Sequence, residues 1–344
     1  GTRHDTDPDQ DPNFGTGTMN PRYRPLAATT LIFVIAYAIC ISQYPGMWST
    51  RVFGNFLTDN AFLGIAAVGA TFVIISGGID LSVGAVIGLT GVITAILISW
   101  VGLHPMAVFA IVLVLAAAFG ASMGAVIHFL QVPPFIVTLA GMFLARGMAS
   151  VLSQDSIPID HEFYRTISSL YYRLPGGGRL SFIGLLMLGT FLVFGFIAHK
   201  TRFGSYVYAI GGNANSASLM GVPTGQVTIG IYALSSFLGG LAGIVYSLYT
   251  SAGYPLAAVG IELDSIAAVV IGGTLLTGGY GFIFGTLIGV MLQGLVQTYI
   301  VFDGTLSSWW TKIAIGFLLF MFILLQKLVF TAQTGRTRLK KAPA

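Results

Sequence analysis

Apolar runs recur along the whole chain, and they restrict it to folds that sit in a lipid bilayer. Examples are LIFVIAYAICI at 31–41, MAVFAIVLVLAAAFGASMGAV at 106–126 and IAIGFLLFMFILL at 313–325. With its flanks, each run approaches the about 20 residues that a helix needs to cross the hydrocarbon core. Only 8% of the 344 residues are charged, against roughly a quarter in a soluble domain. The sequence therefore predicts an all-α polytopic membrane protein.

Turn residues between the apolar runs divide the chain into ten predicted spans. The connections at 77–82 and 278–281 are too short for ordinary loops. Irregular backbone survives at membrane depth only where it is buried or lines a cavity, so we expect broken or re-entrant helices there. The string IAAV precedes both breaks, at 65–68 and 266–269, and is a weak signal of an internal repeat. The predicted spans are 26–44, 56–76, 81–100, 106–128, 133–153, 180–199, 226–250, 262–279, 281–302 and 309–330.

Basic residues predict the orientation of these spans. Most of the 16 Lys and Arg fall on the side of both termini, which the positive-inside rule assigns to the cytoplasm. The hydrophilic segment 154–180 is then a periplasmic loop with a short amphipathic helix, and the segment 199–225 is cytoplasmic. Arg146 and Lys312 remain within spans. Because the basic residues are scattered one or two at a time, orientation explains them better than a nucleic-acid partner does, and we expect no nucleic acid.

Three regions follow from this division of the chain. Residues 1–18 are polar and acidic without apolar periodicity, which indicates a cloning scar or a disordered tail. Residues 19–330 form the predicted transmembrane permease domain. Residues 331–344 are predicted to be a basic cytoplasmic tail.

Several enzyme motifs are missing from the sequence. It contains no GxxxxGK[ST] phosphate loop, no HExxH and no GxSxG, so we expect neither a cradle for ATP phosphates nor a familiar catalytic centre. A single cysteine, Cys40, and the absence of Cys/His ligand spacing argue against a metal site. We therefore expect a transport subunit with no cofactor of its own and no catalytic residue.

Polar side chains within the spans are the candidates for contact with a solute, because such groups are costly in hydrocarbon. Asp80, in GGIDLSVG at 77–84, has two open interpretations: it caps the helix that starts at Leu81, or it touches the substrate. The uncharged groups suit a hydroxyl-rich solute, and the alternative is hydrogen bonding between helices. The candidate substrate-pathway residues are Asn60, Thr71, Asp80, Ser82, Thr138, Gln293 and Gln297, of which the last two share a helix face.

The driving force of transport is expected to come from a partner. Coupling to protons or sodium would require a buried series of Asp, Glu or His, and the spans contain few of these residues. An ion-coupled secondary transporter of a small polar solute and a passive channel remain the alternatives.

Four motifs in order carry a family resemblance. They are GGIDLSVG (77–84), TLAGMFLARG (138–147), YAIGGNANSASLMGV (208–222) and ELDSIAAVVIGGTLLTGG (262–279), and together they resemble the ribose-type branch of ABC sugar importer permeases. The resemblance covers Met19 to about residue 330. Within that branch TDNAFLGIAAVG, SIPI, PGGGRLS and FDGTLSSWWTKIAIG are most similar to the second permease subunit of bacterial galactofuranose importers.

The resemblance implies an architecture and a set of partners. The expected fold is type II importer-like, in the bacterial inner membrane. The expected partners are a homologous second permease in a heterodimer, a cytoplasmic ABC ATPase that binds ATP and Mg, and a periplasmic sugar-binding protein. The expected cargo is a sugar, galactofuranose or galactose.

The resemblance also assigns roles to two groups of residues. The ATPase-coupling positions are Gly211, Gly212, Asn213, Ala217, Leu219 and Gly221; many relatives carry two acidic residues after the Gly-Asn, where this chain has Ala214, Asn215 and Ser216. The outer arginines are candidates for docking acidic patches of the binding protein, or they are ordinary solvated charges: Arg51, Arg165, Arg173 and Arg179.

Overall fold

The chain is a helical bundle, and the computed structural model describes residues 24–307 and 309–340. The all-α polytopic prediction is confirmed. The α-helices are α1 (Arg24–Gln43), α2 (Thr50–Asp59), α3 (Ala61–Ile75), α4 (Val83–Ser99), α5 (Pro105–Phe129), α6 (Pro134–Leu152), α7 (Glu162–Ser169), α8 (Phe182–Lys200), α9 (Arg202–Gly212), α10 (Ala214–Leu219), α11 (Thr224–Thr250), α12 (Ile261–Ile271), α13 (Ile283–Asp303) and α14 (Trp309–Lys340). A 3-10 turn follows α1 at Pro45–Met47.

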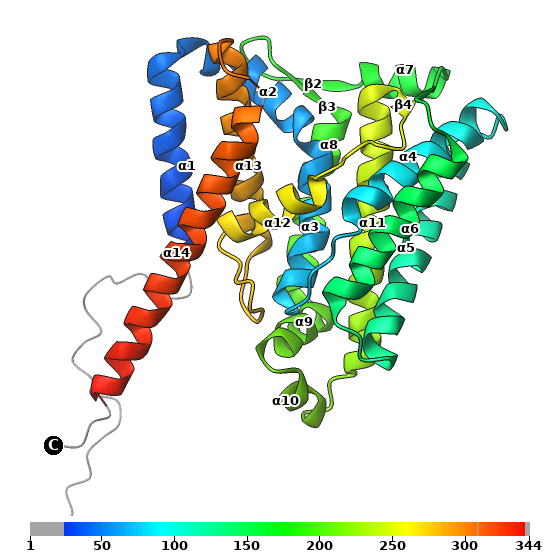
Figure 1. Ribbon diagram of the computed structural model, residues 1–344. Coiled ribbons are helices and arrows are strands. Elements are labelled where there is room, and N and C mark those ends of the chain that lie inside the picture. The colour runs from blue at the N-terminus through cyan, green and yellow to red at the C-terminus, as the bar shows by residue number, and fades with distance from the viewer. Residues whose placement is uncertain (1–23, 308, 341–344) are drawn as a thin grey trace, which may run out of the picture.

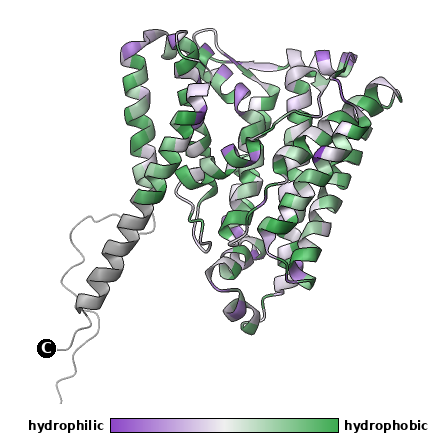
Figure 2. Cartoon of the chain, in the orientation of Figure 1, coloured by the Kyte–Doolittle hydropathy of each residue, from purple (hydrophilic) through white to green (hydrophobic). Residues whose placement is uncertain are grey.

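The long helices lie side by side and give the molecule two distinct ends (Figure 1). The short helices α9 and α10 form the lower end in that view, and α7 lies at the upper end with the short strands. Figure 2 shows apolar residues along the helices and hydrophilic residues gathered near both ends. This distribution is the one that a bilayer imposes, because lipid surrounds the middle of each helix and water meets its ends.

Six helices among the described residues are long and apolar enough to cross a membrane: α1, α5, α6, α8, α11 and α13. A seventh span is the pair α2 and α3, which bends by 54°. The apolar helix α4 is shorter, as is the apolar part of α14 over Trp309–Leu324. The predicted span 262–279 is wrong as a continuous helix, since α12 ends at Ile271 and irregular backbone follows.

Two helix breaks meet inside the bundle. The first lies between α3 and α4 and the second between α12 and α13, each after a copy of the IAAV string. In the second break Gly278 and Gly279 have φ angles of 83° and 75°, which glycine adopts without steric cost. Gly279 N donates to Ile75 O over 2.8 Å, so one break supplies a partner for a carbonyl at the end of α3.

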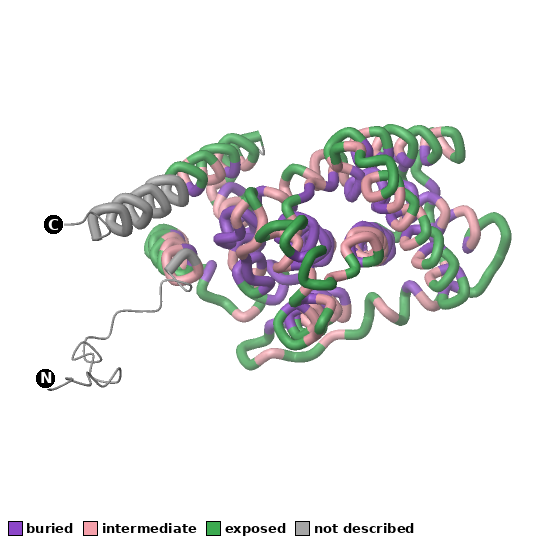
Figure 3. The backbone as a smooth tube through the Cα atoms, turned by 90° about the horizontal axis from the view of Figure 1, so that it is seen from below, coloured by how far each residue is buried: buried purple, intermediate pink, exposed green. Residues whose placement is uncertain are grey.

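Helix α11 lies at the centre of the bundle and packs against α3, α4 and α5. Small residues allow close contact: a Cβ at Gly120 of α5 would lie 2.2 Å from Tyr232 O of α11. Viewed from below, buried residues gather on the central helices and exposed residues on the rim (Figure 3). The core is therefore formed by helix-to-helix packing, whereas α1 is buried over only 11% of its apolar window.

The loop 154–180 forms a cap over the upper end. The loop contains α7, which corresponds to the predicted short amphipathic helix. The His161 side chain accepts from Phe163 N at the start of α7. Two short antiparallel strand pairs were not predicted: β1 (Ile157–Pro158) with β4 (Ala252–Gly253), and β2 (Tyr171–Arg173) with β3 (Arg179–Ser181).

Candidate functional site

Asp80 lies in the first helix break and is fully enclosed by protein. Its Oδ1 accepts from Ser82 N over 2.9 Å and from Ser82 Oγ over 2.6 Å, and its Oδ2 accepts from Ser235 Oγ of α11 over 2.7 Å. Asp80 does not cap α4, because the helix begins at Val83 with Ser82 as its N-cap residue and without a side-chain cap bond; Asp80 instead accepts from Ser82 within the break. Asp80 and Ser82 join the break to the central helix and do not line the cavity described below.

Two other candidate pathway residues also join helices. Thr71 of α3 donates to Ala67 O and shares a hydrogen bond of 2.8 Å with Thr286 of α13. The Thr138 hydroxyl of α6 lies 2.9 Å from Pro134 O of its own helix and 3.2 Å from Ile79 O in the first break. Both side chains are fully buried. Their geometry matches the alternative of hydrogen bonding between helices.

The remaining candidates, Asn60, Gln293 and Gln297, meet at a polar cavity of about 570 Å³. Its walls come from the α2–α3 bend, the end of α11, the start of α12, the second half of α13 and the start of α14. The volume falls in the range of small-molecule sites. A smaller cavity of about 160 Å³ shares Asp59, Asn60, Gln297 and Val301 with it. The larger cavity is lined by Asp59, Asn60, Phe62, Leu63, Tyr246, Tyr249, Ile261, Asp264, Gln293, Gln297, Ile300, Val301, Trp309, Thr311, Lys312 and Ile315.

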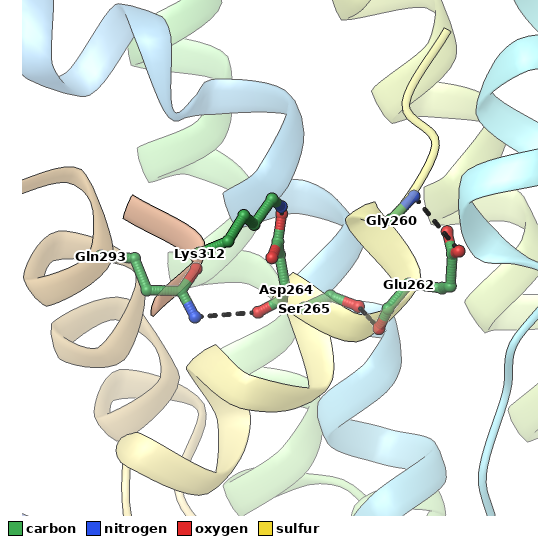
Figure 4. Close-up of polar contacts among 6 residues, drawn as sticks. All are labelled: Gly260, Glu262, Asp264, Ser265, Gln293 and Lys312. Atoms are coloured by element: carbon green, nitrogen blue, oxygen red, sulfur yellow. Dashed lines mark hydrogen bonds and ion pairs between the residues drawn. The ribbon is translucent and has the colours of Figure 1, made fainter. Parts of the chain in front are cut away.

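Polar contacts converge at one wall of the cavity (Figure 4). Gln293 of α13 and Lys312 of α14 both point to the start of α12, where Gln293 Nε2 donates to Asp264 O over 3.0 Å and Lys312 forms an ion pair with Asp264. Gln293 Oε1 is buried and has no hydrogen-bond partner within the described part of the chain. At another wall Tyr249 donates to Asp59 over 3.0 Å. The cavity thus presents both hydrogen-bond donors and acceptors beside aromatic rings.

Sequence reasoning missed eight polar and aromatic residues that line the cavity. One signal was available: Lys312 is a lone cation within a span, and an intramembrane charge usually has a partner nearby. The partner, Asp264, is 48 residues away in the sequence, and only the packing of α12 against α14 brings the two together. The missed polar and aromatic residues are Asp59, Phe62, Tyr246, Tyr249, Asp264, Trp309, Thr311 and Lys312.

The predicted coupling segment touches both helix breaks. Gly211, near the end of α9, packs so closely that a Cβ there would lie 1.8 Å from Ile75 O and 2.5 Å from Gly279 N. Tyr208 of the same helix donates to Gly281 O over 2.6 Å. Helix α9 therefore contacts the end of α3 and the irregular backbone between α12 and α13.

The tip of this segment is exposed and partly apolar. Asn213 caps α10, since its Oδ1 accepts from Ser216 N over 2.8 Å, and Ala217 is buried beneath the helix. Leu219 is 90% exposed and Met220 is 74% exposed. Gly221 has a φ of 85° and turns the chain toward α11. An exposed apolar tip next to a polar surface suits contact with another protein.

All four outer arginines are exposed, and they lie at the end opposite α10. Arg165 pairs with Asp160, and Arg173 faces Arg179 across the β2–β3 pair. The Arg179 guanidinium lies 4.6 Å from the centre of the Tyr171 ring. A hydrogen bond from Arg173, together with the charges of Arg179 and Arg173, lowers the pKa of the Tyr171 hydroxyl. The cap also carries the exposed acids Asp155, Asp160 and Glu162, so its arginines stand among carboxylates of equal number. In residues 24–307 and 309–340 no group of three or more His, Cys, Asp or Glu is arranged to hold a metal ion.

Comparison with known proteins places the chain in a transport family. The family described as "Branched-chain amino acid transport system / permease component" matches residues 52–324. The inner membrane ABC transporter permease protein YjfF of Escherichia coli (strain K12) is 62% identical over 309 residues, which are 90% of this chain and 93% of that protein. The fructose import permease protein FruG of Bifidobacterium longum (strain NCC 2705) is 36% identical, over 87% of this chain and 91% of its own length.

The ribose import permease protein RbsC of Escherichia coli (strain K12) is also 36% identical, over 78% of this chain and 83% of its own length. No solved structure matches the chain. The matches cover most of the bundle, including both helix breaks, the coupling segment and the polar cavity. The chain therefore belongs to this family of membrane permease components, and it is a transport component rather than an enzyme.

Proposed function

We propose that this chain is the transmembrane permease subunit of an ATP-driven bacterial sugar importer. The family name refers to branched-chain amino acids, whereas relatives that cover most of the chain are named for ribose and fructose import. The motif resemblance narrows the proposed cargo to galactofuranose or galactose. An uncharged, hydroxyl-rich solute fits a cavity that offers Asn60, Gln293 and Gln297 beside aromatic rings.

The observation that carries the proposal is the contact of α9 with both helix breaks. Gly211 lies directly against Ile75 O and Gly279 N. The segment that would bind the ATPase therefore contacts the end of α3 and the loop between α12 and α13, and these three helices line the cavity. ATP binding by the partner ATPase would move the coupling segment, and the breaks would pass that motion to α3, α12 and α13. Transport would follow from the change in shape of a path that this chain shares with a second permease.

Three partners belong to this proposal. A homologous second permease completes the path, and the two form a heterodimer. A cytoplasmic ABC ATPase, which binds ATP and Mg, contacts the Leu219 end of α10. A periplasmic sugar-binding protein docks on the arginine-bearing cap at the other end. Both termini are then cytoplasmic, in accordance with the bias of the basic residues.

Reconstitution of the complex in proteoliposomes tests the proposed function. We expect labelled galactofuranose or galactose to enter only when ATP, the ATPase and the binding protein are all present, and an ATPase variant that cannot hydrolyse ATP serves as the control. Uptake by this chain alone along an ion gradient would establish the secondary transporter instead. Uptake that needs neither an ion gradient nor ATP would establish the passive channel.

A further inference from the structure

We propose that Arg146 of α6 is a positioning residue for transport, which holds the connection 251–260 between α11 and α12 in place and passes to the Glu262 carboxylate when that connection moves. The inference rests on the proposed function and names a residue that controls one moving segment of the permease. Both ends of the connection lead to the polar cavity, since Tyr249 near the end of α11 and Ile261 at the start of α12 line it.

The hydrogen bonds of Arg146 are the first argument. Arg146 lies within a membrane span and is partly buried, and its Nη1 donates to Pro255 O over 2.6 Å and to Ala257 O over 2.8 Å. Within residues 24–307 and 309–340 no carboxylate lies at ion-pair distance from it. A cation inside a membrane span is costly and marks a functional element. Here the guanidinium fixes the backbone of the connection and leaves its charge without an acidic partner.

The backbone of the connection is the second argument, because it is strained. Ser251 and Ala258 have φ angles of 52° and 57°, in the left-handed region that side chains of their kind rarely adopt. Such conformations persist only where the surrounding contacts enforce them, and they gather at clamps and switch regions. Loss of the two Arg146 hydrogen bonds would therefore allow the connection to relax.

Helix α4 brings Arg146 and Glu262 close to each other. A Cβ at Gly88 of α4 would lie 2.6 Å from Arg146 Nη1 and 3.0 Å from Pro255 O. A Cβ at Gly84 would collide with Glu262 Oε2. Gly84 and Gly88 are four residues apart, so they occupy neighbouring positions about 5–6 Å apart on one face of the helix. The guanidinium and the carboxylate thus lie over consecutive turns of α4.

The carboxylate of Glu262 is the third argument. Its Oε1 accepts from Gly260 N over 3.2 Å, whereas its Oε2 is buried and has no hydrogen-bond partner among the residues that the structure describes. A buried carboxylate oxygen without a donor is costly. A small shift of the guanidinium from the carbonyls of the connection toward Glu262 would satisfy this oxygen and pair the two charges. The arrangement therefore has two alternative sets of partners for one cation.

Hydrogen exchange of the backbone amides in residues 252–262 tests the clamp, in the purified complex in lipid nanodiscs without ATP or sugar. Arg146→Met keeps a long side chain but removes both donors, and we expect exchange there to rise by about ten-fold, the equivalent of one to two lost hydrogen bonds. Arg146→Lys should give a smaller rise, because its ammonium group retains the charge and three donors. Phe143→Met is the matched control, since Phe143 lies on the same helix and is 65% exposed.

Uptake kinetics test the transfer to Glu262. Glu262→Gln keeps an oxygen for Gly260 N but loses the charge that attracts the guanidinium, so exchange in the resting complex should stay at the wild-type level. We expect each of Arg146→Met and Glu262→Gln to lower the maximal uptake rate by about ten-fold with an unchanged KM. The double variant should be no slower than Arg146→Met alone, because residues that act as one unit have non-additive effects. Arg146→Lys should restore part of the rate.

The outcomes separate this inference from the proposed function. Unchanged exchange in Arg146→Met, or a double variant whose loss of uptake is the product of the two single losses, would overturn the inference even if ATP-driven uptake is intact. The expected exchange and non-additive uptake, driven by an ion gradient instead of ATP, would support the inference and remove the importer. If Arg146→Met does not assemble, exchange in Arg146→Lys and uptake by Glu262→Gln still decide.

Discussion

The carboxylate of Asp80 accepts from Ser82, its near neighbour in the sequence, and from Ser235, which is 155 residues away. Both of its oxygens are occupied by Ser82 and Ser235, so the side chain stabilises the first break and ties it to α11. The sequence interpretation placed the helix start at Leu81, whereas α4 begins at Val83 and Asp80 stabilises the break before it. What the sequence could not supply was Ser235, because a hydrogen bond across the fold leaves no local signal.

Substitution of Asp80 tests this role at the residue scale. Asp80→Ala should lower the free energy of unfolding by about 1–3 kcal/mol for each buried donor left unpaired. Asp80→Asn retains a side-chain oxygen and should cost less. Thermal unfolding of the purified complex measures both variants. If Asp80→Ala keeps its thermal stability but loses transport, the alternative of direct substrate contact is the better explanation.

Gly211 and Gly212 are adjacent in sequence but differ in their surroundings, and they form a matched pair. A Cβ at Gly211 would collide with the backbone at Ile75 and Gly279, whereas a Cβ at Gly212 would meet nothing within 4 Å. Backbone atoms of a buried break cannot move aside easily. Gly211→Ala should therefore cost about 1–3 kcal/mol of stability through overpacking. Thermal unfolding should show a lower midpoint for Gly211→Ala than for Gly212→Ala, and equal midpoints would contradict the close contact.

At the scale of elements, apolar runs and turn residues predicted most of the helices. Each of the other nine predicted spans corresponds to a helix or to the bent pair α2–α3, because local hydropathy is sufficient to identify them. The span at 262–279 was wrong because GGTLLTGG is apolar enough to continue a helix by hydropathy, while its glycines end α12 at Ile271.

The lining of the cavity was only partly predictable from the sequence. Gln293 and Gln297 share a face by helical periodicity, but Asp264 and Lys312 meet through tertiary packing alone.

Helix α10 provides a test of the coupling segment. Leu219 is almost fully exposed and Ala217 is buried, so α10 presents one apolar residue outward while it packs through the other. Leu219→Asp should leave the stability of the chain within about 0.5 kcal/mol, as expected for an exposed position. We expect it to reduce copurification of the ATPase by about ten-fold, because a charge would be buried at the interface. Leu219→Met is the control; full ATPase recovery with Leu219→Asp would exclude this contact.

At the scale of the whole molecule, the two ends of the bundle have different chemistry. The lower end in Figure 1 carries α9 and α10, with an apolar tip and contacts to both breaks. The upper end carries α7 and the β2–β3 pair, with four exposed arginines. The polar cavity lies toward this upper end, since its α13 residues come from the half of the helix that ends at Asp303. A solute that enters from the upper end would thus reach the cavity first and the two helix breaks, which α9 contacts, afterwards.

Reversal of the outer arginines tests whether they form part of a docking surface. Arg51, Arg165, Arg173 and Arg179 are exposed, so replacing all four with Glu should change folding stability little. Complementary charges mainly control the rate and salt dependence of association. We expect stimulation of ATP hydrolysis by the sugar-binding protein to fall by about ten-fold at low salt, with basal hydrolysis retained. Replacement by Lys, which preserves the charge, is the control. Stimulation at the wild-type level, with an unchanged dependence on ionic strength, would mean that these arginines are ordinary solvated charges and that the binding protein docks through other groups.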